Sequence, residues 1–113
     1  MKPKIVTLCG STRFFKEFQI ANYEETMKGN IVLSVGFYPY GGDGVWQKRE
    51  HGELIGITAE QKQMLDELYK RKIDISDEIF VLNIGGYIGD STRSEIVYAE
   101  KYGKVIRYIE PIV

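Results

Sequence analysis

Four short apolar runs alternate with longer stretches of helical spacing, and this alternation constrains the fold more than any other feature. The runs are rich in β-branched residues, as strands buried on both faces are. They are "KIVTL" from Lys4 to Leu8, "NIVLSV" from Asn30 to Val35, "EIFVLN" from Glu78 to Asn83 and "KVIRYIE" from Lys104 to Glu110. The stretches from Ser11 to about Lys28, from about Thr58 to Lys72 and from about Ser91 to Tyr102 predict helices.

The order β-α-β-α-β-α-β implies right-handed crossovers and a parallel sheet with helices on both faces. A chain of 113 residues is the size of a single domain, which we assign to 1–113. We therefore predict a three-layer α/β fold of the flavodoxin or Rossmann type, with about four strands in the order 2-1-3-4. Ligands of such sheets bind in the crevice beyond the carboxyl ends of the strands.

The tripeptide Ser-Thr-Arg occurs twice, as Ser11-Thr12-Arg13 and Ser91-Thr92-Arg93, each time between a strand and a helix. In the predicted strand order the first and third strands are neighbours, so the two turns should lie side by side. Helix N-termini attract anions, and an anionic ligand would offset the unfavourable position of an arginine in a first helical turn. The alternative is that these hydroxyls only cap their helices, which needs no ligand.

Glu95 admits two interpretations. Thr92-Arg93-Ser94-Glu95 matches the S/T-x-x-E capping box, in which the glutamate bonds the N-cap amide. Alternatively, Glu95 is a carboxylate held at the ligand edge of the sheet, able to act as a nucleophile. Spacing alone favours the cap.

Other carboxylates are also expected near the crevice, namely Asp66, Asp74, Asp77 and Asp90. Asp66 has Lys62 at i−4 and Lys70 at i+4, a pattern typical of a solvated helical face.

Composition excludes several classes of function. The formal net charge is −1, which gives no field to attract DNA or RNA. The single cysteine, Cys9, lies in an apolar run, so we expect a packing residue and a reducing interior. The sequence lacks a signal peptide, an apolar run long enough to span a bilayer, metal-ligand spacing and the common dinucleotide and NTP motifs. We expect a soluble cytoplasmic protein with no metal or organic cofactor.

The stretch from Gly36 to Ile57 holds six glycines together with Trp46 and His51. A connection this long in a compact domain is usually functional or disordered, and we interpret it as a lid or specificity loop. Its aromatic residues, Tyr38, Tyr40 and Trp46, leave open a role as a protein-interaction surface.

Three segments resemble the nucleoside 2-deoxyribosyltransferase-like superfamily: "VTLCGSTR", "KIDISDEIFVLN" and "GGYIGDSTRSEIVYAEKYGK". This group includes the deoxyribosyltransferases and the deoxynucleoside 5′-monophosphate N-glycosidases. The resemblance covers most of the chain outside the Gly36 to Ile57 stretch, and the likeness is greatest to a small bacterial and phage branch.

The resemblance implies a role for each candidate residue. Glu95 would be the nucleophile, and Asp66 would contact the sugar or the base and assist departure of the base. Gly10, Ser11 and Arg13 would help to bind a 5′-phosphate. The other candidates for substrate binding are Thr12 in the first turn and Gly89, Asp90, Ser91, Thr92 and Arg93 in the second.

The expected function is therefore an N-glycosidase or deoxyribosyltransferase acting on a nucleotide or nucleoside. We expect a homodimer or higher homo-oligomer that binds a small-molecule substrate, with no nucleic-acid polymer or membrane as partner. The alternative is a non-catalytic nucleotide-binding sensor module that uses the same crevice, with Glu95 serving only as a helix cap.

Overall fold

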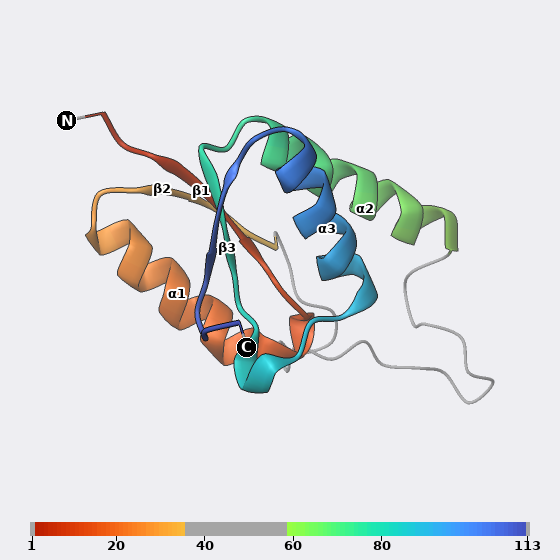
Figure 1. Ribbon diagram of the computed structural model, residues 1–113, viewed down its shortest axis with the longest axis horizontal. Helices are drawn as coiled ribbons and strands as arrows, with labels where there is room; N and C mark the ends of the chain where they lie inside the picture. Colours follow the sequence, from red (N-terminus) through yellow and green to blue (C-terminus); the bar gives the residue numbers. More distant parts are fainter. Residues whose placement is uncertain (1, 36–58, 113) are drawn as a thin grey trace.

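The structure, a computed structural model, describes residues 2–35 and 59–112 (Figure 1). Its strands are β1 (Ile5–Cys9), β2 (Ile31–Leu33), β3 (Glu78–Val81) and β4 (Val105–Tyr108), and its helices are α1 (Phe15–Met27), α2 (Ala59–Asp74) and α3 (Asp90–Lys101). Two 3-10 turns, Thr12–Phe14 and Ile84–Gly86, follow β1 and β3. The predicted cap Thr58 and the predicted loop with Tyr38, Tyr40, Trp46 and His51 lie outside the described residues.

The four strands form one parallel sheet in the order β2-β1-β3-β4, as the sequence predicts. The central pair is β1 with β3, in which Cys9 lies opposite Val81. α1 covers one face of the sheet, and α2 and α3 lie side by side on the other (Figure 1). The architecture is a three-layer, Rossmann-like α/β fold, and no helix in the described ranges is long and apolar enough to cross a bilayer.

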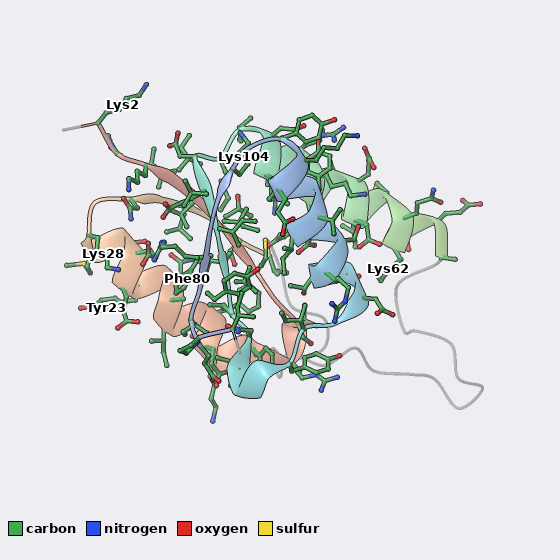
Figure 2. All side chains as sticks on the ribbon, in the orientation of Figure 1. Lys2, Tyr23, Lys28, Lys62, Phe80 and Lys104 are labelled. Atoms are coloured by element: carbon green, nitrogen blue, oxygen red, sulfur yellow. The ribbon has the colours of Figure 1, made fainter. Side chains whose placement is uncertain are left out.

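Alternation along β1 divides the core between the two faces. Val6 and Leu8 pack with Phe18 of α1, whereas Cys9 packs with residues of α2, β3 and α3. On β3, Phe80 likewise lies toward α1 (Figure 2). Because side chains alternate with a period of two along a strand, Cys9 at the end of β1 necessarily faces the helical layer opposite α1.

The amino-terminal edge of the sheet carries a cluster of ion pairs. Arg107 Nη2 lies 2.6 Å from a carboxylate oxygen of Glu25 and 2.8 Å from one of Glu78. Lys28 Nζ and Asn30 Nδ2 also donate to Glu25, at 2.9 and 3.1 Å. Glu25 is only 2% exposed, and although burial alone would raise its pKa, the hydrogen bonds from Arg107, Lys28 and Asn30 and the charge of Arg107 lower it.

Two carboxylates expected near the crevice lie instead toward this amino-terminal edge of the sheet. Asp77 accepts a hydrogen bond from the amide of Ile5 at 2.8 Å, and Asp74 pairs with Arg71 and accepts from the Tyr98 hydroxyl. Both residues precede β3, so they lie at the amino end of that strand. The sequence interpretation was wrong for Asp74 and Asp77.

Gly10 lies in tight packing against Leu82, the residue after β3. A Cβ at this position would lie 3.2 Å from both the Cβ and the carbonyl oxygen of the fully buried Leu82. We expect Gly10→Ala to lower the free energy of unfolding by about 1 to 2 kcal/mol, measured by urea denaturation. Ser94→Ala, at an exposed position of α3, is the control and should change stability by less than about 0.5 kcal/mol. Equal effects of the two substitutions would contradict this account.

Candidate active site

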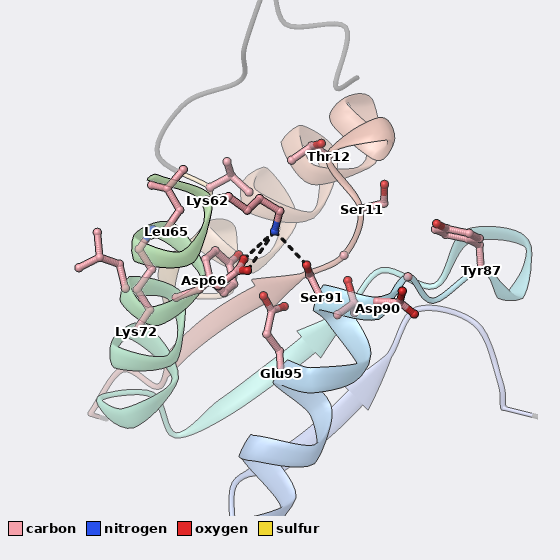
Figure 3. A pocket seen from close by; sticks show the side chains of 16 residues that line it. Ser11, Thr12, Lys62, Leu65, Asp66, Lys72, Tyr87, Asp90, Ser91 and Glu95 are labelled. Carbon is pink, nitrogen blue, oxygen red and sulfur yellow. Dashed lines mark hydrogen bonds and ion pairs between the residues drawn. The ribbon is translucent and has the colours of Figure 1, made fainter. Parts of the chain in front are cut away.

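A cavity of about 480 Å³ lies at the carboxyl-terminal edge of the sheet, between α2, α3 and the turn after β1 (Figure 3). Both predicted turns reach it, so the expectation that they lie near each other is confirmed. The predicted site residues that line the cavity are Gly10, Ser11, Thr12, Asp66, Gly89, Asp90, Ser91, Thr92 and Glu95.

The two arginines of the turns do not line the cavity. Arg93 is exposed on α3, and because each helical residue turns by about 100°, its side chain points roughly 200° away from that of Glu95. Arg13 lies over the ring of Tyr87, with its guanidinium carbon 4.2 Å from the ring centroid. Tyr87 itself lines the cavity, so Arg13 contacts a residue of the cavity wall and not the cavity itself. The structure thus corrects the expectation that both arginines face the crevice.

Ser11 forms the cap predicted for the first turn. Its Oγ accepts a hydrogen bond from the amide of Arg13 at 3.2 Å, at the start of the 3-10 turn that leads into α1. Ser91 differs, since its Oγ accepts a hydrogen bond from Lys62 Nζ at 3.2 Å, across from α2. The Ser11 hydroxyl therefore makes a local capping bond, whereas the Ser91 hydroxyl takes part in a contact between α2 and α3.

The capping-box interpretation of Glu95 is wrong. α3 begins at Asp90 with Gly89 as its N-cap, so Thr92 is the third helical residue and Glu95 the sixth. A residue in the second helical turn cannot reach back to the N-cap amide. Glu95 is instead 9% exposed and points into the cavity (Figure 3).

The environment of Glu95 raises the pKa of its carboxyl group from 4.5 to about 7. Burial is the main cause, and the negative charge of Asp66 acts in the same direction. The Cys9 thiol and the positive charges of Lys62 and Lys70 oppose the rise. The cavity therefore contains a carboxyl group that titrates near neutral pH, a property common among functional carboxylates.

Asp66 and Lys62 form a second polar group opposite Glu95. Lys62 Nζ lies 2.9 and 3.0 Å from the two carboxylate oxygens of Asp66 and also donates to Ser91 (Figure 3). The i,i+4 pair is the one that the sequence predicts. Its interpretation as a purely solvated face was incomplete, because both residues line the cavity.

Sequence reasoning missed several residues of the cavity wall. The polar ones are Lys72, whose Nζ donates to the carbonyl of Ser34 at 2.6 Å, and Tyr69, whose hydroxyl donates to the carbonyl of Leu8. The apolar ones are Val35, Leu65 and Leu68. The spacing of Lys62, Leu65, Asp66 and Tyr69 places them on one face of α2, which was the available signal. Periodicity does not say which face of a helix borders a cavity.

No protein-family model and no curated protein sequence matches this chain. Within residues 2–35 and 59–112, no group of three or more His, Cys, Asp and Glu side chains is placed to hold a metal ion.

Proposed function

We propose that the protein is an N-glycosidase or 2-deoxyribosyltransferase that cleaves the N-glycosidic bond of a nucleoside or nucleotide, with Glu95 as the nucleophile. The observation that carries the proposal is a nearly buried carboxyl group lining the cavity at the ligand-binding edge of the sheet. Burying a carboxylate is unfavourable, and Glu95 caps no helix that would account for its position. A catalytic role explains why it is there.

The reaction would proceed in two displacements at C1′ of the sugar. An oxygen of Glu95 forms a bond to C1′ while the C1′–N bond breaks and its electron pair leaves with the base. Water, or the nitrogen of a second base, then attacks C1′ from the opposite face and releases the Glu95 carboxylate. Two inversions give net retention of configuration. Asp66, held by Lys62, would accept a hydrogen bond from a sugar hydroxyl or from the base.

The cavity suits a ligand with one polar and one apolar end. Its volume of about 480 Å³ lies in the range that holds small organic ligands. The hydroxyls of Ser11, Thr12 and Ser91 line it where the first turn meets the start of α3, and Leu65 and Leu68 add apolar surface from α2. These features support a sugar or phosphate near the turns and a base packed against α2.

Covalent trapping tests the proposal. The protein is incubated with 2′-fluoro-arabinosyl nucleosides and nucleotides of purine and pyrimidine bases, and its intact mass is measured. A sugar-sized adduct is expected on the wild type and not on Glu95→Gln. Glu100→Gln is the matched control, because it removes an exposed carboxylate of the same helix and leaves the cavity unchanged. Nucleotide binding by calorimetry without any adduct would instead support the non-catalytic sensor module.

The pH dependence of activity follows from the role of Glu95. Only the ionised carboxylate is a nucleophile, and its pKa is about 7. We expect kcat/KM to rise about tenfold per pH unit below pH 7 and to level off above it, since this parameter reports ionisation of the free enzyme. Initial rates of base release between pH 5 and pH 9 check this. A rate that falls through pH 7 would assign Glu95 the role of an acid.

A further inference from the structure

Tyr87 is an aromatic residue of the cavity wall that comes from the segment between β3 and α3. It is 42% exposed, and its hydroxyl points back toward Ser11 of the first turn (Figure 3). Leu65, which adds apolar surface from α2, lies on the opposite side of the cavity (Figure 3). Tyr87 therefore borders the end of the cavity where the two turns meet.

Two residues of the first turn hold the Tyr87 side chain. Arg13 lies over the ring, with its guanidinium carbon 4.2 Å from the ring centroid, and its Nη2 donates to the Tyr87 hydroxyl at 3.4 Å. The ring of Phe14 meets the ring of Tyr87 edge on, with centroids 6.1 Å apart and planes inclined at 74°. Contacts of both kinds are favourable, so they fix a partly exposed aromatic side chain at the edge of the cavity.

The Tyr87 hydroxyl has a proton to donate. A phenolic hydroxyl both accepts and donates hydrogen bonds. Arg13 uses an acceptor position, and no side chain or carbonyl within residues 2–35 and 59–112 accepts the proton. Gly89 leaves room beside the hydroxyl, because a Cβ there would lie 3.2 Å from its oxygen. A hydrogen bond from a cation also polarises the hydroxyl and makes it a stronger donor.

We propose that Tyr87 is a binding residue whose hydroxyl donates to an oxygen of the sugar or of its 5′-phosphate, and that Arg13 is the positioning residue that holds Tyr87 in place. This inference rests on the nucleoside or nucleotide proposed above as the ligand of the cavity. It gives Arg13 a role although the arginine does not line the cavity, since the guanidinium acts on the ligand through the tyrosine.

Tyr87→Phe tests the binding role, because it keeps the ring that contacts Arg13 and Phe14 and removes only the hydroxyl. Binding of the four common deoxynucleosides, their 5′-monophosphates and the free bases is measured by calorimetry in a Glu95→Gln background, so that no ligand is cleaved. We expect the monophosphates to bind about tenfold more weakly and the free bases to bind unchanged. An equal loss for the deoxynucleosides assigns the acceptor to the sugar, and a loss confined to the monophosphates assigns it to the phosphate.

Tyr23→Phe is the matched control, because Tyr23 is an exposed tyrosine of α1 that does not line the cavity. It should bind every ligand as its parent does, and circular dichroism confirms that each variant is folded. Unchanged binding in Tyr87→Phe would overturn the inference. A parent protein that binds none of these ligands would overturn it as well.

A double-mutant cycle tests the positioning role of Arg13. Arg13→Met removes the guanidinium, and we expect it to weaken binding about threefold when Tyr87 is present. In the Tyr87→Phe background we expect less than about a 1.5-fold effect, because the hydroxyl on which Arg13 acts is gone. Equal losses in the two backgrounds would mean that Arg13 acts independently of Tyr87, and the positioning role would be wrong.

The covalent trap separates this inference from the proposed function. With Glu95 intact, Tyr87→Phe should raise the trap concentration for half-maximal labelling about tenfold and leave the maximal rate within about threefold. An unchanged half-maximal concentration would overturn the inference. If the wild type forms no adduct but Tyr87→Phe still weakens binding in the calorimeter, the proposed function fails and the roles of Tyr87 and Arg13 in ligand binding stand.

Discussion

We expect Glu95→Gln to lower base release, the activity proposed above, at least about a thousandfold and at the same time to make the protein more stable. The loss of activity follows because an amide cannot replace the carboxylate as nucleophile. The gain in stability follows because the wild type keeps a carboxyl group with 9% exposure, whose ionised form is poorly solvated. A residue that only stabilised the fold would show the opposite sign of stability change.

The gain in stability depends on pH in a defined direction. The pKa of Glu95 is raised from 4.5 to about 7 in the folded protein. The ionised form of Glu95 therefore lowers the free energy of unfolding. The penalty is absent below about pH 4.5, grows between pH 4.5 and pH 7 and is complete above pH 7. We therefore expect Glu95→Gln to be close to the wild type at pH 4 and more stable by about 3 kcal/mol at pH 8.

Urea denaturation of both proteins at pH 4 and pH 8 measures this difference. Glu100→Gln is the matched control, because Glu100 lies on the same helix with its side chain exposed. That control should change stability by less than about 0.5 kcal/mol at either pH. A Glu95→Gln variant that is less stable than the wild type at pH 8 would contradict the inference that the buried, ionised Glu95 destabilises the fold.

Arg107→Met will lower the free energy of unfolding by about 2 to 4 kcal/mol at pH 7. The substitution removes the guanidinium, whose carbon lies 4.4 Å from the centroid of the Phe80 ring. It leaves Glu25 and Glu78, which are 2% and 5% exposed, without their main cation. The pKa of Glu25 is lowered in the folded state, so its contribution is present at neutral pH and is lost as pH falls through the acid range. The effect of the substitution should therefore diminish below about pH 4.

Arg71→Met provides the comparison for Arg107→Met. Arg71 also pairs with two carboxylates, those of Glu67 and Asp74, but all three side chains are solvent-exposed. Exposed ion pairs contribute little, and we expect a loss of about 1 kcal/mol or less. Thermal and urea denaturation of the two variants measure the contrast. Equal losses would mean that burial of the carboxylates does not determine the strength of the cluster.

The sequence predicts the fold well because its signals are local. Alternating β-branched runs and helical spacing are enough to assign the strands and helices, and the chirality of crossovers restricts their arrangement to the parallel order that is observed. The proximity of the two turns also follows, since residues after neighbouring parallel strands meet at one edge. The errors at Asp74 and Asp77 came from neglecting that residues before a strand lie at the other edge.

The chemistry of the site is less accessible from the sequence. Thr92 and Glu95 have the spacing of a capping box, and only the start of α3 at Asp90 shows that the pattern lies inside the helix. Lys62 and Asp66 look like a solvated pair because the position of α2 beside α3 depends on tertiary packing. The meeting of Ser11 and Glu95 at one cavity likewise requires the paired strands to be in place, and no local pattern encodes it.

The pairing of β1 with β3 gives the candidate site a further use. Ser11 and Glu95 line one cavity only when β1 lies beside β3 in the observed register and α3 has docked on the sheet. Neither β1 nor α3 alone forms this site. Covalent labelling of Glu95, once established, would therefore count the molecules that have the correct topology. The trap could be added to a refolding sample at successive times. The labelled fraction would then follow the appearance of native chains and would not include chains that are only compact.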